Sequence, residues 1–217
     1  MKALSDWFGM RRGKGFAVNE SRWVVLDVEA SGLDPKRAQL LAIAAIALRV
    51  DWNHKRLEID LGDSFEVFLR QQMPSSRANI MLHGIGAQQQ RDGVPAQRAM
   101  REFCAFIGNS PLLAFHSAFD RALIRRASLV ELGAELPNPW IDIEQLCAVT
   151  HASSRARSLD EWMEQLAVTC AVRHQASADA LAECDILQRL WGPVAAQCRN
   201  WQDVARMAAS HRWIARG

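Results

Sequence analysis

The sequence contains no tyrosine, so a catalytic site built on that side chain is excluded. Its cysteines are odd in number, and no two of them are separated by two residues. This argues against both a disulfide framework and a structural zinc site. The five are Cys104, Cys147, Cys170, Cys184 and Cys198. We expect reduced thiols, as in a cytoplasm.

A long apolar run is also missing. The longest one, residues 40–48, includes four alanines and is too short to cross a bilayer. The basic residues near the N-terminus have no apolar core of signal-peptide length beside them. We therefore expect a soluble, cytoplasmic protein.

Charge of one sign does not dominate either, because the sequence has 26 basic and 24 acidic residues and a net charge of +2. This balance argues against broad electrostatic wrapping of a nucleic-acid duplex. It permits a local basic groove beside an acidic metal site, because the local field matters more than the total charge. The length of 217 residues suits one large domain, with or without tails.

The first half of the chain reads as strands. Residues 23–28 form a β-branched apolar run, which predicts a buried strand. Residues 39–50 are rich in alanine and would also suit a helix, but the turn residues on both sides favour a strand. Residues 57–70 alternate in part and predict a third strand, kinked at Gly62-Asp63. These three would form an antiparallel meander.

Helices and short strands alternate in the remainder, which implies an α/β sandwich around a mixed sheet. Ser158 and Glu161 form a capping box, and Gly192-Pro193 is a common helix stop. The predicted helices are 95–107, 118–130, one beginning at Ser158 and one from Ser177 to about Trp191. Residues 111–115 predict a short strand, and residues 140–146 predict either another short strand or a strand-to-helix turn.

We predict three parts: an N-terminal leader (1–19), a domain (20–192) and a helical tail (193–217). The tail carries four large apolar residues, which would either dock a partner or pack on the domain. They are Trp201, Val204, Met207 and Trp213.

Three segments carry chemistry, each at the end of a buried element. Asp27 and Glu29 are two residues apart on a strand, so both point to one face and repel unless a cation neutralises them. Asp120 would lie in the first turn of one helix. Asp179 would lie in the first turns of another, just after His174. Alone, each residue is as well explained by capping or solvation.

Together these residues point to metal chemistry. Carboxylate oxygens suit Mg²⁺ or Mn²⁺ rather than zinc. Two such ions roughly 4 Å apart can clamp the attacking and leaving oxygens of a phosphodiester. A nearby histidine can take the proton of the attacking water.

The ordered set resembles the three motifs of the DEDDh (DnaQ-like) 3′→5′ exonucleases, in particular the proofreading type of bacterial DNA polymerase III. Residues 27–34 match the first motif, 116–120 the second and 174–180 the third. The resemblance implies a ribonuclease H-like three-layer α/β fold. Its mixed five-stranded sheet joins an antiparallel meander of three strands to two parallel strands, with helices on both sides.

The resemblance also implies a set of site residues. The two metal ions would be held by Asp27, Glu29, Asp120 and Asp179, with His174 as the general base. The substrate contacts would be Ala30, Ser31, Leu33, His83, Ile85, His116 and Phe119. Leu33 would wedge against a base or simply pack in its turn, and Ser117 stands where the family more often has Asn.

Phosphate contacts need basic side chains, and five arginines are candidates. They are Arg121, Arg125 and Arg126 on one predicted helix, and Arg155 and Arg157 in a polar loop.

The predicted activity is release of nucleoside 5′-monophosphates from the 3′ end of single-stranded DNA. Two alternatives stay open. One is an exoribonuclease of the same family, since no motif reads the 2′-hydroxyl. The other is a silent nucleic-acid-binding or polymerase accessory module.

Overall fold

The computed structural model describes residues 16–213, so most of the predicted leader lies outside the described residues. A five-stranded sheet has the order β3-β2-β1-β4-β5. Its strands are β1 (Arg22–Ala30), β2 (Leu40–Asp51), β3 (Arg56–Phe68), β4 (Leu112–Ala114) and β5 (Trp140–Asp142). The first three are antiparallel, and β4 and β5 run parallel to β1. The predicted mixed sheet is confirmed.

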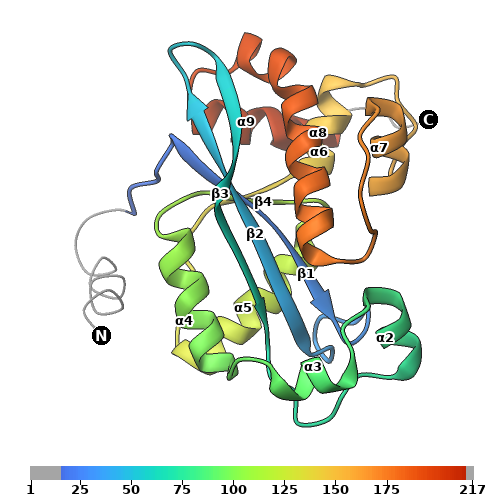
Figure 1. Ribbon diagram of the computed structural model, residues 1–217. Helices are drawn as coiled ribbons and strands as arrows, with labels where there is room; N and C mark the ends of the chain where they lie inside the picture. The colour runs from blue at the N-terminus through green and yellow to red at the C-terminus, as the bar shows by residue number, and fades with distance from the viewer. Residues whose placement is uncertain (1–15, 214–217) are drawn as a thin grey trace.

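Helices cover both faces of this sheet (Figure 1). Helices α4 and α5 lie on one face, and α6, α8 and α9 on the other. Two short helices between β3 and α4, which the sequence patterns did not predict, lie near the C-terminal end of β1. The helices are α2 (Arg77–His83), α3 (Ala87–Asp92), α4 (Ala96–Ile107), α5 (Ala118–Leu132), α6 (Ile143–Thr150), α7 (Leu159–Leu166), α8 (Ala176–Gln197), α9 (Trp201–Ala209) and the 3₁₀ turn η2 (Ser210–Trp213).

Alternate residues of β1 point to opposite faces of the sheet and so contribute to two separate hydrophobic clusters. Val24 and Leu26 are buried with residues of α4 and α5, whereas Val25 is buried with residues of α6 and α8. Side chains two apart on a strand share a face. Asp27 and Glu29 therefore continue the row of Val25 and lie on the side of the sheet that α8 covers.

Strand β2 settles the helix-or-strand ambiguity of residues 39–50 in favour of a strand. Ala44 pairs with Asp27, and Ala42 pairs with Glu29. Small side chains beside the two carboxylates let α8 approach this face closely. The kink predicted in β3 is also present, because the pairing shifts by three residues where Ile46 pairs with Ser64 but Ala47 pairs with Asp60.

The C-terminal segment corrects one expectation. The predicted helix stop at Gly192-Pro193 is wrong, since α8 continues through Pro193 to Gln197. A proline inside a helix costs about 3 kcal/mol, but Trp191 and Val194 on either side of it are buried in the core. That burial offsets the cost.

The described part of the predicted tail packs on the domain. Trp201 of α9 makes an edge-to-face contact with Trp23 of β1, with ring centroids 5.0 Å apart. Val204 is fully buried in the hydrophobic cluster that contains these two tryptophans, and Met207 packs against that cluster. Of the two alternatives for these residues, packing is the one observed; the side chain of Trp213 lies outside the described residues.

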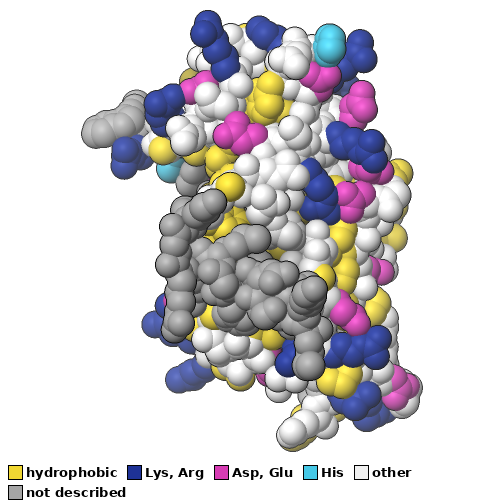
Figure 2. All heavy atoms as spheres, turned by 90° about the vertical axis from the view of Figure 1, so that its left-hand side faces the viewer, with side chains coloured by type: hydrophobic (Ala, Val, Ile, Leu, Met, Phe, Trp, Pro, Cys, Tyr) yellow, Lys and Arg dark blue, Asp and Glu magenta, His cyan; other side chains and the backbone are white. Residues whose placement is uncertain are grey.

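The surface fits the balanced composition. Figure 2 shows basic and acidic side chains interspersed on one face of the molecule. Among the helices of residues 16–213, none combines the length and apolar character needed to cross a bilayer. All five cysteines are free, as predicted.

Candidate active site

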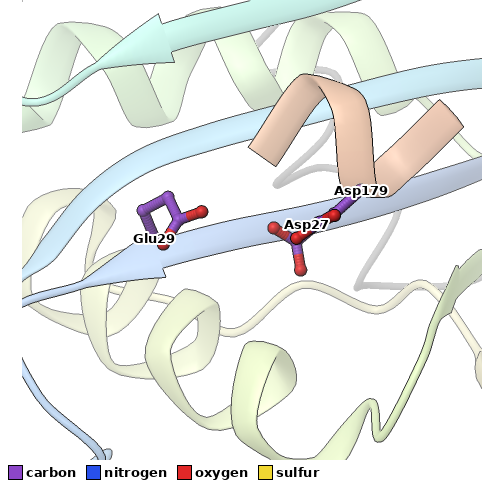
Figure 3. A group of neighbouring side chains, drawn as sticks. All are labelled: Asp27, Glu29 and Asp179. Atoms are coloured by element: carbon purple, nitrogen blue, oxygen red, sulfur yellow. The ribbon is translucent and has the colours of Figure 1, made fainter. Parts of the chain in front are cut away.

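Three of the predicted metal ligands meet under the beginning of α8. Asp27 and Glu29 come from the C-terminal half of β1, and Asp179 from the first turn of α8. One oxygen of each carboxylate lies within 4.8 Å of the other two. Figure 3 shows the three side chains converging across the gap between strand and helix.

Asp120 lies beside this group without belonging to it. It is buried in the first turn of α5, and its charge helps to raise the pKa of both Asp27 and Glu29. Burial raises the pKa of Asp120 itself to about 8, although hydrogen bonds from its own backbone amide and that of Val28 oppose this. The fold thus brings three of the predicted ligands together and places Asp120 near enough for its charge to act on two of them.

The electrostatics of the group show a shortage of positive charge. Burial, and then the charge of Asp179, raise the pKa of Glu29 to about 8. Burial, followed by the charges of Asp120 and Glu29, holds the pKa of Asp27 well above its usual range. Crowded carboxylates of this kind need protons or cations to neutralise them. An all-oxygen set fits a hard divalent cation such as Mg²⁺ or Mn²⁺.

His174 is fixed to the group through its backbone. It adopts a left-handed conformation with φ of 62°, and its N–H donates to Asp179 Oδ2 at 3.0 Å. Its side chain is exposed. The strained turn therefore places an accessible imidazole five residues before Asp179, one of the three clustered carboxylates.

The backbone of the second motif is held by a carboxylate from β5. Ser117 precedes α5, but its side chain does not cap the helix. Instead, the carboxylate of Asp142 accepts the backbone N–H of His116 at 2.9 Å and that of Ser117 at 3.1 Å. His116 is left-handed with φ of 53°, and its side chain is exposed. Asp142 was not predicted; it stands at the end of a short strand, where it also caps α6.

A cavity of about 200 Å³ adjoins the carboxylates. The predicted residues His83 and Ile85 line it together with Glu29 and the first residues of α8. His83 is buried, with Nε2 2.8 Å from Asn79 Oδ1 and with Nδ1 accepting the Ile85 N–H at 2.9 Å. The ring therefore shapes the wall of the cavity and has both nitrogens engaged.

Three of the other predicted substrate contacts lie in the first motif, and Phe119 lies in the second. The carbonyl of Ala30 accepts Asn79 Nδ2 at 3.0 Å, and Ser31 Oγ accepts the Gln39 N–H at 2.8 Å. Leu33 is 91% exposed, so the alternative that it packs within its turn is not what the structure shows. Phe119 is partly buried against the α4–α5 core.

Three of the five candidate arginines have intramolecular partners. Arg126 donates to the carbonyls of Pro35 and Ala38, which fastens the loop after β1. Arg125 pairs with Glu135, and Arg157 Nη1 donates to the carbonyl of Ala156 at 2.8 Å. The other two line surface hollows: Arg121 lines one with Trp140, the first residue of β5, and Arg155 lines one beside α7.

One buried carboxylate was missed. Glu183 lies one turn after Asp179 on α8 and is 1% exposed. Burial, and then the charges of Asp27 and Asp120, raise its pKa well above the usual range. A lone glutamate in a helix usually lies on the solvated face, so its sequence context gave no signal.

Comparisons with known proteins define the class. The family model RNase_T, described as "Exonuclease", matches residues 24–187. The chain belongs to this exonuclease family. The resemblance to DnaQ-like exonucleases is confirmed, and so is the prediction of an exonuclease domain.

The chain is similar to parts of much larger proteins. It is 26% identical to the PolC-type DNA polymerase III of Clostridium perfringens, over 78% of this chain and 11% of that protein. It is also 26% identical to the corresponding protein of Caldanaerobacter subterraneus subsp. tengcongensis, over 86% of this chain and 13% of that protein. The chain thus spans about an eighth of the length of these relatives.

Solved structures share the fold. A structure of exonuclease I has a TM-score of 0.66 at 14% identity, over 81% of this chain and 43% of that chain. The zinc-bound form of an E. coli exonuclease I complex with single-stranded DNA has a TM-score of 0.65 at 14% identity, over 82% and 43%. These matches confirm the ribonuclease H-like three-layer fold.

Proposed function

We propose that this chain is a 3′→5′ exonuclease that removes nucleoside 5′-monophosphates from single-stranded DNA ends. The observation that carries the proposal is the convergence of Asp27, Glu29 and Asp179 within 4.8 Å. Such crowding of carboxylates is costly without a cation, and a silent binding module would have no use for it.

The cofactor in this proposal is a pair of Mg²⁺ or Mn²⁺ ions. Bound divalent ions would activate the attacking water and stabilise the leaving 3′ oxygen of the phosphodiester. Asp27, Glu29, Asp120 and Asp179 would hold them. The exposed imidazole of His174 would accept the proton of the attacking water.

The substrate end would lie along the first motif and the cavity beside it. The backbone of Ala30 and Ser31 would meet the terminal nucleotide, and the exposed Leu33 side chain would pack against its base. His83 and Ile85 would form the wall behind the sugar. His116 and Phe119 would contact the strand from the second motif.

DNA is favoured over RNA because the relatives are named DNA polymerases, and one structural neighbour is a complex with single-stranded DNA. A polymerase is accordingly the proposed protein partner. Because Trp201 and Val204 are buried within this chain, such a partner would use other surfaces. A cytoplasmic location is part of the proposal and agrees with the five free cysteines.

Single-stranded DNA and RNA of the same sequence, each labelled at the 5′ end, test this function with Mn²⁺ or EDTA. Stepwise shortening of the labelled DNA, dependent on Mn²⁺, is expected. Immediate release of a labelled mononucleotide would indicate attack from the 5′ end. Faster shortening of the RNA would make the protein an exoribonuclease, and no cleavage of either strand would favour a binding module.

A further inference from the structure

Arg173 lies in the turn before α8 and connects two carboxylates of different environments. Its Nε donates to Asp160 Oδ1 of α7 at 2.6 Å, and its Nη1 donates to Asp179 Oδ1. The Asp160 side chain is 65% exposed, whereas that of Asp179 is 7% exposed. The guanidinium therefore reaches from the surface into the acidic group.

This contact occupies one carboxylate oxygen of Asp179, which is one of the three residues whose carboxylates converge. Asp179 Oδ1 accepts Arg173 Nη1 and also the Cys170 thiol at 3.4 Å. Asp179 Oδ2 accepts the His174 N–H at 3.0 Å. A carboxylate oxygen offers two lone pairs, so these bonds use both on Oδ1 and leave one on Oδ2.

The charge of Arg173 acts on the other ligands as well. Its guanidinium lowers the pKa of both Asp27 and Glu29, against the larger effect of burial. Arg173 thus supplies part of the positive charge that the carboxylates need. A divalent cation at the same place would supply this charge more fully and would repel the guanidinium.

We propose that Arg173 is the resident counter-ion of the acidic group, and that a divalent cation binds by displacing its guanidinium from Asp179. Asp160 keeps the displaced guanidinium at the solvent side. Arg173 then sets the metal affinity of the site, stabilising the metal-free protein and weakening metal binding. The inference rests on the metal site proposed above.

Calorimetric titration with Mn²⁺ alone tests this on the full chain. Arg173→Met removes the charge but keeps an unbranched side chain of similar length, and should bind Mn²⁺ on the order of tenfold more tightly than wild type. Arg173→Lys keeps a charge but cannot bridge both carboxylates, so its Mn²⁺ affinity should lie between those of wild type and Arg173→Met. The matched control is Arg206→Met, which removes an Arg–Asp ion pair on the distant helix α9 and should bind like wild type (Figure 1).

Thermal unfolding gives a second readout that needs no activity. Arg173→Met should unfold below wild type in EDTA and should gain more stability from Mn²⁺. If that variant does not fold without metal, Arg173→Lys carries the test. Wild-type or weaker Mn²⁺ affinity in the folded Arg173 variant would overturn the inference. Failure of the wild type to bind Mn²⁺ would instead overturn the metal site itself, which is a separable result.

Discussion

The backbone N–H of Phe115 donates to the buried carboxylate of Glu183 at 3.1 Å. This bond joins the end of β4 to α8, directly before the turn that leads to Asp120. Glu183 therefore connects the helix of one proposed ligand, Asp179, to the segment that positions another, Asp120. Burial and neighbouring carboxylates hold the pKa of Glu183 well above its usual range, which favours the neutral acid.

Glu183→Gln should leave the protein within about 1 kcal/mol of wild-type stability, because an amide reproduces the neutral acid and still accepts the Phe115 N–H. Glu183→Ala leaves that N–H unpaired and should cost about 1–3 kcal/mol. Urea unfolding of both variants measures the difference. Equal destabilisation by the two changes would mean that the hydrogen bond to Phe115 contributes little.

The metal-free protein should lose stability as pH rises. Glu29 and Asp120 each have a pKa of about 8 in the folded protein. A carboxyl whose pKa is higher folded than unfolded binds its proton more tightly in the native state. Its contribution is therefore present at low pH and is lost as pH rises from about 4 towards 8. Thermal unfolding in EDTA across this range should show the decline.

Mn²⁺ should reverse that decline, because the cation neutralises the same charges. The stabilisation by Mn²⁺ should be larger near pH 8 than near pH 5, because near pH 5 protons already neutralise these carboxylates. Asp120→Asn should reduce the pH dependence in EDTA. A metal-free protein that grows more stable over this range would contradict the assigned shifts.

Trp201→Ala should destabilise the whole domain by about 3–5 kcal/mol, because it leaves a cavity in the aromatic cluster around Trp23. Urea unfolding measures this. Met81→Ala, at a side chain 77% exposed, is the control and should change stability by less than about 0.5 kcal/mol. A small effect at Trp201 would show that α9 is a separable tail.

Leu33→Ala should weaken binding of the 3′ end by about tenfold, which corresponds to burying one leucine against a base. The steady-state KM on a short single strand measures this, while Mn²⁺ affinity should not change. Val130→Ala, which shortens another exposed apolar side chain far along α5, should leave KM unchanged. An unchanged KM in Leu33→Ala would mean that the Leu33 side chain does not contribute to substrate binding.

Much of this site could be predicted because its residues sit at element ends. Alternation along β1 fixed the common face of Asp27 and Glu29, and a helix start fixed Asp179 near its N-terminus. The residues that connect these carboxylates could not be predicted from the local sequence pattern. Glu183 and Arg173 acquire their roles only when α8 packs across β1, which is a tertiary relationship.

In the fold, too, features set by local sequence could be predicted and features set by tertiary packing could not. The capping box at Ser158 is formed, because both of its hydrogen bonds are local. The stop at Pro193 is not, because burial of Trp191 and Val194 outweighs a local preference. Helices α2 and α3 have only 7 and 6 residues, which is too short for a periodic signal. They are held by contacts such as the bond from Asn79 to the Ala30 carbonyl.

The most direct test of the account measures the release of nucleoside 5′-monophosphates from single-stranded DNA by Asp27→Asn in Mn²⁺. The change keeps the shape of the side chain and removes the charge at the centre of the carboxylate group. Asp185→Asn, on a carboxylate of α8 that lines a different hollow, is the matched control. We expect Asp27→Asn to lose at least about 10²-fold in rate and the control to keep its rate. Wild-type release by Asp27→Asn would contradict the central claim that these carboxylates hold the ions that drive the reaction.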